Sequence, residues 1–524
     1  MGFARSALVC VLLVGTAVQA RTLSKDEKRR DFEQLASMIK THYGPFEFKL
    51  ARYKIDIDKL TEDYANRAEK VSNLEFYHLI NRYVAEFHDS HFRSSAQIQH
   101  VSTLGFIADR IGKTVLLDVI DRAVLPEARF PFQRGDEIID IGGKPAADVV
   151  ADLAAYIPSG NPESALRLAS VMIGFRPSMV VPPGHGVTKV SIRRGTSSIV
   201  ETVVLPWLEA GDLEDEDAAP TWDIIPPDYA QLSIADIYAG LPKAEQAFRC
   251  SGLTRTAIPK GAVPVMTTPF VAYYHPTAKG NVGYLRIPHY SWEKGTEDLR
   301  YEQYEFAIEQ LEKNTVGLII DQDHNCGGSV FFLEKMIGLF ADKPFQGLEF
   351  QFLGSRAEYL DFRTWVEGDA KRTLQGQDWL GVVDLVKKAW EGSDRLTAKT
   401  TFHNNRKLAP NAVRYTKPIV MLIDEMSGSG GDAFPVMMQG MGRAVLMGKR
   451  TMGAGGHVTP MPNLNNSASR VSITKSMFYR PDGVPVENNG AEPNIVYEPT
   501  RDDFMYGYRE YQKRYLEELA KLLP

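Results

Sequence analysis

The sequence has 524 residues, of which 44% are hydrophobic and 24% are charged, and its formal net charge is −6. At roughly 100–200 residues per domain, this length predicts two to four domains with a sizeable core. The balanced charge, which includes no large basic run, argues against a nucleic-acid-binding protein.

The first twenty residues have the pattern of a secretory signal peptide. Arg5 gives a positive start, an apolar stretch of about ten residues follows, and Val18 and Ala20 fit the small-residue cleavage site. We expect the mature protein to begin near Arg21 and to be exported, either to a periplasm or out of the cell. A buried N-terminal helix is the alternative. No later stretch is apolar over some 18 residues, so we expect no transmembrane span.

Two segments of different periodicity follow the signal peptide. Residues 21–100 carry apolar side chains at helical spacing, which predicts a helical N-terminal domain. Residues 101–206 change to strand-like patterns with glycine turns, as in "RGDEIIDIGGKP", which predicts a compact β-rich module. Residues 207–265 are acidic and rich in turn formers, and we interpret them as a linker or an exposed insertion.

From residue 266 to residue 505, strands and helices alternate. "GNVGYLRIP", "TVGLIIDQD" and "PIVMLIDE" are typical of buried strands, and each precedes a helical pattern, with an insertion at about 345–412. This alternation predicts an α/β domain built of βαβ units around a parallel sheet, in which ligands bind at the carboxyl ends of the strands. Two glycine clusters, "NCGGS" and "SGSGGD", fall at such ends. Residues 506–524 predict a C-terminal helix.

Ser429 lies in "MSGSGGDAF", where a predicted strand turns into a helix. A serine is a weak nucleophile that needs a neighbouring base. The stretch is similar to a nucleophile elbow, although Ser427 stands where the first glycine of that motif would be. A glycine-rich helix N-cap without chemistry is the alternative. The turn "DHNCGGS" at 323–329 can aim backbone N–H groups at a developing oxyanion, or it is a tight turn and nothing more.

A base for this serine has to be a histidine, a lysine or a carboxylate. The spacing of the histidines does not choose among five candidates: His88, His91, His289, His324 and His457. Glu487, in "VPVENNGAEPNIV", could orient a histidine or be an exposed loop residue. "HDSH" could be a metal pair, but no second ligand cluster supports it, and we expect neither metal nor cofactor.

Cysteine usage leaves one alternative nucleophile. After removal of the signal peptide, Cys250 and Cys326 remain, which permits one disulfide and no disulfide framework. Cys326 lies close to His324 in the chain, so a cysteine hydrolase is a second hypothesis for the same turn.

The ordered set of motifs resembles the S41 serine peptidases, the group of tail-specific proteases and tricorn protease. "DSHF", "RGDEIIDIGGKP", "LIIDQDHNCGGS" and "MLIDEMSGSGGDAF" match in order, and "GKRTMGAGGHV" and "VENNGAEPNIV" follow as in the family. The resemblance implies a multidomain α/β protein. It has a helical N-terminal part, a PDZ-like β-rich module and a ClpP/crotonase-like βα catalytic core.

The family has two catalytic branches. One uses a serine–lysine dyad, but Ala454 occupies the position of that lysine here, and Lys449 comes five residues too early. The other branch, with tricorn and the chlamydial protease-like activity factor, uses serine, histidine and glutamate. The resemblance implies the following roles: Ser429 as nucleophile, His91 as base, Glu487 with Ser90 as orienting groups, and the N–H groups of Gly430 and of Gly327 or Gly328 as oxyanion hole.

We therefore expect a secreted serine endopeptidase that acts on proteins or peptides, with no nucleic-acid partner, and we leave a homodimer open. A non-catalytic binding protein on the same fold is one alternative. A serine esterase using His457 is another, although Glu487 follows this histidine in the wrong order for that class. The β-rich module is stretched at 159–184, so its peptide groove is expected to be altered. Residues 207–265 could also cover the site or be cut during maturation.

Overall fold

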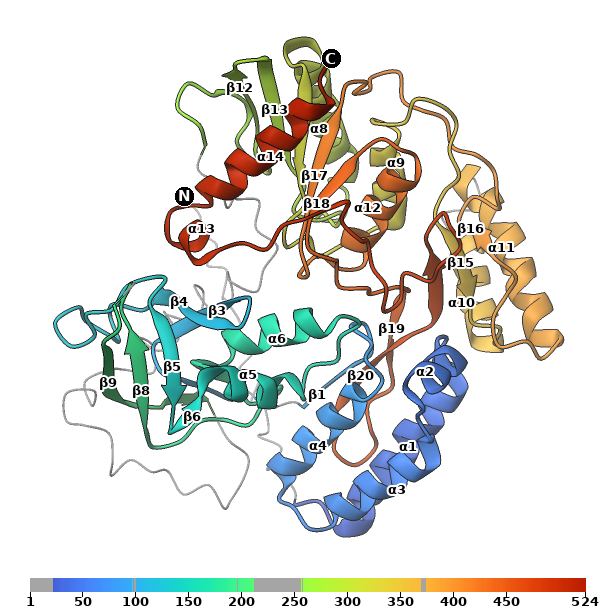
Figure 1. Cartoon of the computed structure of the whole chain (residues 1–524). Helices are drawn as coiled ribbons and strands as arrows, with labels where there is room; N and C mark the ends of the chain where they lie inside the picture. The colour runs from blue at the N-terminus through green and yellow to red at the C-terminus, as the bar shows by residue number, and fades with distance from the viewer. Residues whose placement is uncertain are drawn as a thin grey trace, which may run out of the picture.

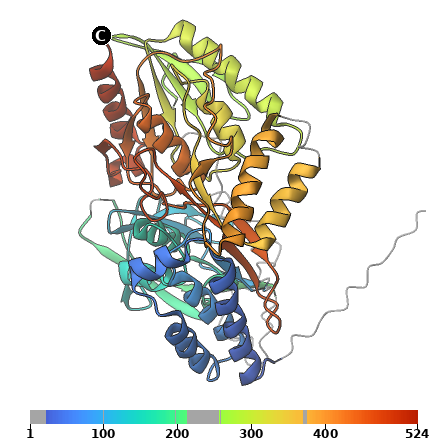
Figure 2. The same cartoon turned by 90° about the vertical axis from the view of Figure 1, so that its right-hand side faces the viewer.

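The computed structural model describes residues 22–96, 98, 100–195, 197–211, 256, 258–368 and 374–524. Within them the chain forms a helical N-terminal unit, a β-rich module and a larger α/β domain (Figure 1). The side view in Figure 2 shows the α/β domain above the other two. The predicted signal peptide and most of 207–265 lie outside the described residues.

Four helices form the N-terminal unit: α1 (Lys25–His42), α2 (Phe46–Tyr53), α3 (Ile57–Ala68) and α4 (Asn73–Ala85). Helices α1 and α4 each begin at a serine that forms a capping box with a glutamate three residues later, which satisfies free N–H groups of the first turn. Phe32 and Phe76 pack edge to face in the core of the unit. The same core contains Val471 and Ile473 from the α/β domain, so the two units share one hydrophobic interior.

A small sheet joins the helical unit to the α/β domain. Its order is β1–β20–β19, with β1 (Arg93–Ser95), β20 (Arg470–Thr474) and β19 (Val458–Met461). Strand β1 is antiparallel to β20, with Ser94 opposite Val471. The segment 89–92, just before β1, is therefore fixed against the α/β domain although the two are far apart in sequence.

The β-rich module contains two sheets and two helices. One sheet has the order β3–β4–β5–β8–β9, with β6 beside β5, and the other has the order β10–β2–β7. Their bounds are β2 (His100–Thr103), β3 (Phe106–Ile111), β4 (Thr114–Ile120), β5 (Glu137–Ile141), β6 (Lys144–Pro145), α5 (Ala146–Ala154), α6 (Pro162–Val171), β7 (Phe175–Pro177), β8 (Val187–Arg193), β9 (Val200–Pro206) and β10 (Leu208–Gly211).

One predicted boundary of this module differs from the structure. Residues 208–211, expected in the linker, form β10 because they pair in register with β2, with Leu208 opposite Thr103. The stretch 159–184, expected as an extension of the module, forms α6 and β7 and packs into the module's core.

The α/β domain is built on a seven-stranded sheet of order β11–β12–β13–β14–β17–β18–β22. The five strands from β13 to β22 are parallel, and β11 and β12 add an antiparallel edge. The strand bounds are β11 (Val263–Met266), β12 (Ala272–Thr277), β13 (Gly280–Arg286), β14 (Gly317–Asp321), β17 (Ile419–Ile423), β18 (Val445–Gly448) and β22 (Ile495–Val496).

Helices cover both faces of this sheet (Figure 1). Leu318 and Ile320 of β14 face α8 (Glu297–Asn314), α9 (Val330–Ile337) and α12 (Gly430–Gly440), whereas Ile319 faces α14 (Arg509–Leu522), which follows α13 (Arg501–Met505). The predicted insertion holds β15 (Glu349–Phe352), α10 (Arg356–Glu367), α11 (Leu374–Glu391) and β16 (Thr400–Thr401), and β15 pairs with β21 (Ser476–Tyr479). These layers place the carboxyl ends of β14 and β17 next to each other.

Candidate active site

Ser429 stands between the end of β17 and the first residue of α12, in a strained turn. Its φ of 60° and ψ of −114° are rare for a residue with a side chain, and such strain persists only where neighbours hold it. The Ser429 N–H donates to Asp432 Oδ2 (2.8 Å), and Asp432 in turn accepts from the Gly453 and Ala454 N–H groups (2.8 and 2.9 Å). Asp432 thus ties the nucleophile turn to the loop after β18.

Asp432 was missed in the sequence analysis. It lies three residues after Ser429, the spacing of a capping box, so the signal was present in the sequence. Burial raises the pKa of this carboxyl to about 6, although the hydrogen bonds from Thr451, Gly453, Ala454 and Ser429 act in the opposite direction.

The glycine turn after β14 lies directly against the nucleophile turn. A Cβ on Gly327 would stand 2.6 Å from the Gly430 nitrogen, and the Gly428 N–H donates to the Asn325 carbonyl (2.9 Å). The Gly327 N–H is engaged, since it donates to Asn325 Oδ1 (2.8 Å). In the described part of the chain, the N–H groups of Gly328 and Gly430 have no acceptor. Of the two glycines expected at this turn, Gly328 is thus the one with a free donor.

His91 and Ser429 line the same cavity, which has a volume of about 480 Å³. The walls are largely apolar and include Tyr156, Met172 and Met452. Ala454, at the position where the dyad branch of the family has its lysine, also lines it. The cavity is large enough for a peptide side chain and brings together residues from all three parts of the fold.

The imidazole of His91 is kept neutral by its surroundings. Burial lowers its pKa to about 4, although the charge of Asp89 acts in the opposite direction. Its Nδ1 atom is buried and has no hydrogen-bond partner among the described residues. Asp89 accepts from the His91 backbone N–H (2.8 Å) and from the Tyr43 hydroxyl (2.8 Å), so it fixes the turn that carries the histidine.

Glu487 is completely buried but is not paired with His91. Its carboxylate forms an ion pair with Lys49 of α2, and it accepts from the Gly455 N–H (2.7 Å). Burial and the charge of Asp89 raise the pKa of Glu487 to about 8, with Lys49 opposing them. The expected orienting contact between Glu487 and His91 is therefore not formed in this structure, because Lys49 occupies the carboxylate.

Ser90 also has a different partner from the expected one. Its hydroxyl accepts from the Gly160 N–H (3.0 Å), at the start of the stretch that leads into α6. Ser90 thus joins the turn that carries His91, here called the base turn (residues 88–92), to the β-rich module rather than to Glu487.

Lys49 and Asn488 are further residues that the sequence analysis missed. The Lys49 ammonium donates to the His88 carbonyl (2.8 Å) and to Asn488 Oδ1 (2.6 Å), and Asn488 Nδ2 donates to the same His88 carbonyl (2.7 Å). Lys49 in "FEFKL" lies between apolar residues, which was a possible signal, but nothing in the sequence connects it with residue 487. These contacts lock the base turn onto the loop that carries Glu487.

The other candidate side chains are engaged elsewhere. Cys326 lines the cavity but is disulfide-bonded, so it holds no free thiol, and the cysteine-hydrolase hypothesis is wrong. His457 contacts Ser476 Oγ (2.8 Å) and Glu358 (3.3 Å), and the His88 ring stacks on Tyr53. Lys449 forms ion pairs with Glu425 (3.2 Å) and Glu498 (3.0 Å) and not with Ser429.

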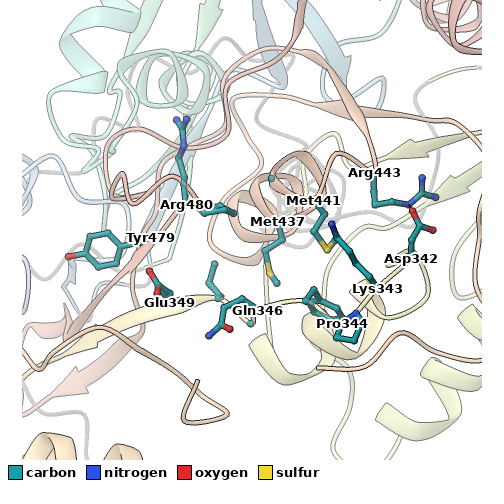
Figure 3. A pocket seen from close by; sticks show the side chains of 15 residues that line it. Asp342, Lys343, Pro344, Gln346, Glu349, Met437, Met441, Arg443, Tyr479 and Arg480 are labelled. Atoms are coloured by element: carbon teal, nitrogen blue, oxygen red, sulfur yellow. Dashed lines mark ion pairs between the residues drawn. The ribbon is translucent and has the colours of Figure 1, made fainter. Parts of the chain in front are cut away.

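A second cavity of about 350 Å³ lies at the opposite end of α12 (Figure 3). Met437 and Met441 lie beside it, and charged side chains stand around it, among them Lys343, Glu349 and Arg480. No residue lines both cavities, so this one belongs to a separate surface from Ser429.

Comparison with known proteins gives consistent matches. Residues 281–497 match the model of peptidase family S41, and residues 100–216 match that of a PDZ domain. A protein of Chlamydia muridarum is 28% identical over an alignment of 460 residues, covering 74% of this chain and 75% of the relative. A protein of Chlamydia pneumoniae is 26% identical over an alignment of 567 residues, covering 93% and 89%.

The fold is also shared with a solved structure. The crystal structure of mature CPAF matches with a TM-score of 0.81 at 22% identity, over 95% of this chain and 98% of that one. This likeness shows that the helical unit, the PDZ domain and the α/β domain form one known arrangement. Among the described residues, no helix is long and apolar enough to cross a membrane.

Proposed function

We propose, from the premise that this chain carries a serine-peptidase domain of family S41 behind a PDZ domain, that it is an exported endopeptidase using Ser429 and His91. The observation that carries the proposal is the cavity shared by these two side chains, next to two unused N–H donors. In the reaction, the neutral imidazole of His91 takes the proton from the Ser429 hydroxyl as the latter attacks the peptide carbonyl. The imidazolium then returns that proton to the leaving amine.

The oxyanion of the intermediate would accept hydrogen bonds from the Gly328 and Gly430 N–H groups. Preorganised donors of this kind act on charge that appears only during the reaction, and each is worth about 3–4 kcal/mol in the barrier. The helix α12 begins at Gly430, so its N-terminal dipole favours the same negative charge. The acyl-enzyme on Ser429 is then hydrolysed by water, which His91 activates in the same way.

Glu487 is proposed as the group that stabilises the imidazolium, with Ser90 holding the turn beside it. Two observations support a role at the site: the carboxylate is buried and contacts Lys49, which also bonds the His88 carbonyl, and the His91 Nδ1 atom has no hydrogen-bond partner in the part of the chain that the structure describes. Transfer of the carboxylate from Lys49 to Nδ1 would complete a Ser–His–Glu relay.

The test is labelling of the purified protein with a fluorophosphonate, which reacts with activated serines. We expect labelling and peptide cleavage in the wild type, loss of both in Ser429→Ala, and strong reduction in His91→Ala. A folded wild-type protein that is not labelled would instead support a non-catalytic binding protein. Cleavage of esters but no peptide in a library would favour the esterase.

Export is proposed from the first twenty residues alone. N-terminal sequencing of the protein recovered outside the cytoplasm should begin near Arg21, and an intact Met1 there would overturn this part of the proposal.

A further inference from the structure

The carboxylate of Asp424 connects both loops of the candidate active site. Asp424 follows β17, and its Oδ1 accepts from the Met426 N–H (3.2 Å) and contacts the Ser427 hydroxyl (3.0 Å), both in the nucleophile turn. The same oxygen accepts from the His324 N–H (2.8 Å), which belongs to the turn that carries Gly328. One side chain thus fixes the turn of Ser429 relative to the turn of the proposed oxyanion hole.

A buried arginine from the β-rich module holds this carboxylate. Arg167 lies on α6, only 5% exposed, and its Nη1 contacts Asp424 Oδ2 and Glu425 Oε1, both at 3.3 Å. The other edge of the guanidinium makes a two-point contact with Asp109 of β3 (2.9 and 3.0 Å). Arginine suits this place because its planar fork can serve carboxylates on two sides at once.

Two further residues of the same stretch contact the loops around the nucleophile. The Ser164 hydroxyl donates to the Glu425 carbonyl (2.5 Å), and Asn161 Nδ2 donates to the carbonyls of Arg450 and Thr451 (3.1 and 3.2 Å). Thr451 also bonds Asp432, the residue that accepts from the Ser429 N–H. The stretch 159–184 therefore contacts the loops on both sides of the Ser429 turn: Ser164 contacts Glu425, and Asn161 contacts Thr451.

Charge explains why a cation is needed there. Asp109, Asp424 and Glu425 bring three carboxylates to one buried place. Of these three, Lys449 pairs with Glu425 (3.2 Å), and its other ion pairs are with Glu498 (3.0 Å) and Glu163 (3.9 Å). Removal of Arg167 would take a cationic partner from the buried Asp424, and the imidazole of His324, which also contacts Asp424 (3.2 Å), is charged only when protonated. A buried carboxylate left without its partner moves toward water or takes up a proton, and either change alters the bonds it makes to the two turns.

We propose that Arg167 is a positioning residue for catalysis: through Asp424 it holds the Ser429 turn and the Gly328 turn at their working separation. The inference rests on the proposed serine-peptidase function. It assigns to α6 a part in assembling the active site, in addition to its place in the core of the module.

The test compares Arg167→Gln with the wild type, per folded molecule. We expect kcat to fall about tenfold to a hundredfold with KM within about twofold, since small misplacements of reacting groups have effects of this size. The rate of fluorophosphonate labelling should fall in parallel, because this small probe reports on the two turns and needs no peptide recognition. Arg193→Gln is the matched control: it removes an ion pair with Glu137 (3.0 Å) between two strands of the module, and its labelling rate should equal that of the wild type.

A role in stability alone predicts a different result. Arg167→Gln would then unfold at a lower temperature, but its folded fraction would be labelled at the wild-type rate, and this outcome would overturn the inference. If Arg167→Gln does not fold, Arg167→Lys decides, because the ammonium keeps the charge but lacks the planar fork that holds Asp109 on one edge and Asp424 on the other: slower labelling at unchanged melting temperature supports the proposal, and the wild-type rate refutes it. Absence of labelling in the wild type would refute the proposed function itself, which is a separate result.

Discussion

His91 is a half-buried histidine that lines a largely apolar cavity and lies near the carboxylate of Asp89. Its usual pKa would leave a good part of it protonated in mildly acidic solution, where it could not accept a proton from a serine. Because burial lowers this pKa to about 4, the base stays neutral over a wider range of pH. The residue therefore suits a role as general base in acidic as well as neutral surroundings.

This environment predicts the acid side of the pH–rate profile. The base acts only when unprotonated, so kcat/KM should rise with pH through about 4 and be level from about pH 5 to pH 7. The measurement is kcat/KM for a peptide substrate across pH 3–7, with Ser429→Ala as the blank. A rise centred on pH 6 to 7, where an exposed histidine titrates, would contradict the assignment of His91.

The carboxyl group of Glu487 predicts a second change at higher pH. Its pKa of about 8 means that it becomes charged as the pH rises through that value, and a charged acceptor stabilises an imidazolium better than a neutral one. We expect kcat/KM to rise a second time near pH 8, and Glu487→Gln to remove this rise while leaving the rise near pH 4. A wild-type profile with no change between pH 7 and pH 9 would exclude Glu487 from the relay.

Lys49 is a fully buried cation whose ion-pair partner, Glu487, is also fully buried. Lys49→Met keeps the length of the side chain but leaves Glu487 without its ion pair, so at pH 9, where Glu487 is charged, we expect a loss of about 3–5 kcal/mol in the free energy of unfolding. Denaturant unfolding measures it. Lys40→Met, which removes an exposed pair with Asp58, is the control and should change little.

The loss of stability in Lys49→Met should also depend on pH. Without Lys49 the carboxyl of Glu487 is more easily protonated, and a neutral carboxyl is less costly to bury. The difference in stability between variant and wild type should therefore shrink as the pH is lowered. A difference that grows toward acidic pH would mean that the pair does not control the charge of Glu487.

At the scale of elements, the site is made by two strand–turn–helix units that lie side by side. Strands β14 and β17 are adjacent and parallel, so the turns that follow them meet, and glycines allow the meeting to be close. Gly327 has a φ of 76° and lies against Ser429 and Gly430 with no space for a side chain.

Gly327→Ala should therefore damage catalysis. The added Cβ would stand 2.7 Å from the Cβ of Ser429 and would push the two turns apart, so we expect kcat to fall about a hundredfold or more, comparable to losing an oxyanion donor. The control is Gly442→Ala, which has a similar φ of 68° but open space around it. It should lower stability slightly and leave kcat unchanged. Equal kcat in the two variants would show that the contact of the turns is not needed.

At the scale of the whole molecule, His91 and Ser429 line one cavity because separate parts of the chain share interiors. The helical unit and the α/β domain contribute to one hydrophobic cluster, and β1 pairs with β20. The β-rich module adds Arg167 and Asn161 to the loops on the other side. Catalysis would therefore depend on the packing of all three parts.

Ile473→Ala tests this dependence from a position that touches no catalytic residue. Ile473 is fully buried in the shared cluster, and its truncation should cost about 2–5 kcal/mol of stability. We expect calorimetry to show one unfolding transition shifted to lower temperature, with peptide cleavage lost in that same transition. Val458→Ala, at a side chain 44% exposed on β19, should leave the transition in place. A separate early transition of the helical unit alone would show that the parts fold independently.

The sequence by itself determined the periodic elements and the local turns of this protein. Apolar spacing is a property of neighbouring residues, so the helical unit, the βαβ alternation and the glycine turn at Ser429 could be predicted from it. The order of motifs also indicated the peptidase family. The linker predicted at 207–265 began too early, because residues 208–211 pair with β2, a strand that is distant in the sequence.

Only the tertiary structure decided which side chains meet. In the folded protein His91 lines the same cavity as Ser429, and Glu487 forms an ion pair with Lys49. The Gly327 N–H is engaged by Asn325, so Gly328 is the glycine of that turn with a free donor among the described residues. The tertiary structure also brought Arg167 to Asp424. These pairings join residues that are far apart in the chain, and their geometry follows from the packing of whole units, about which local spacing carries no information.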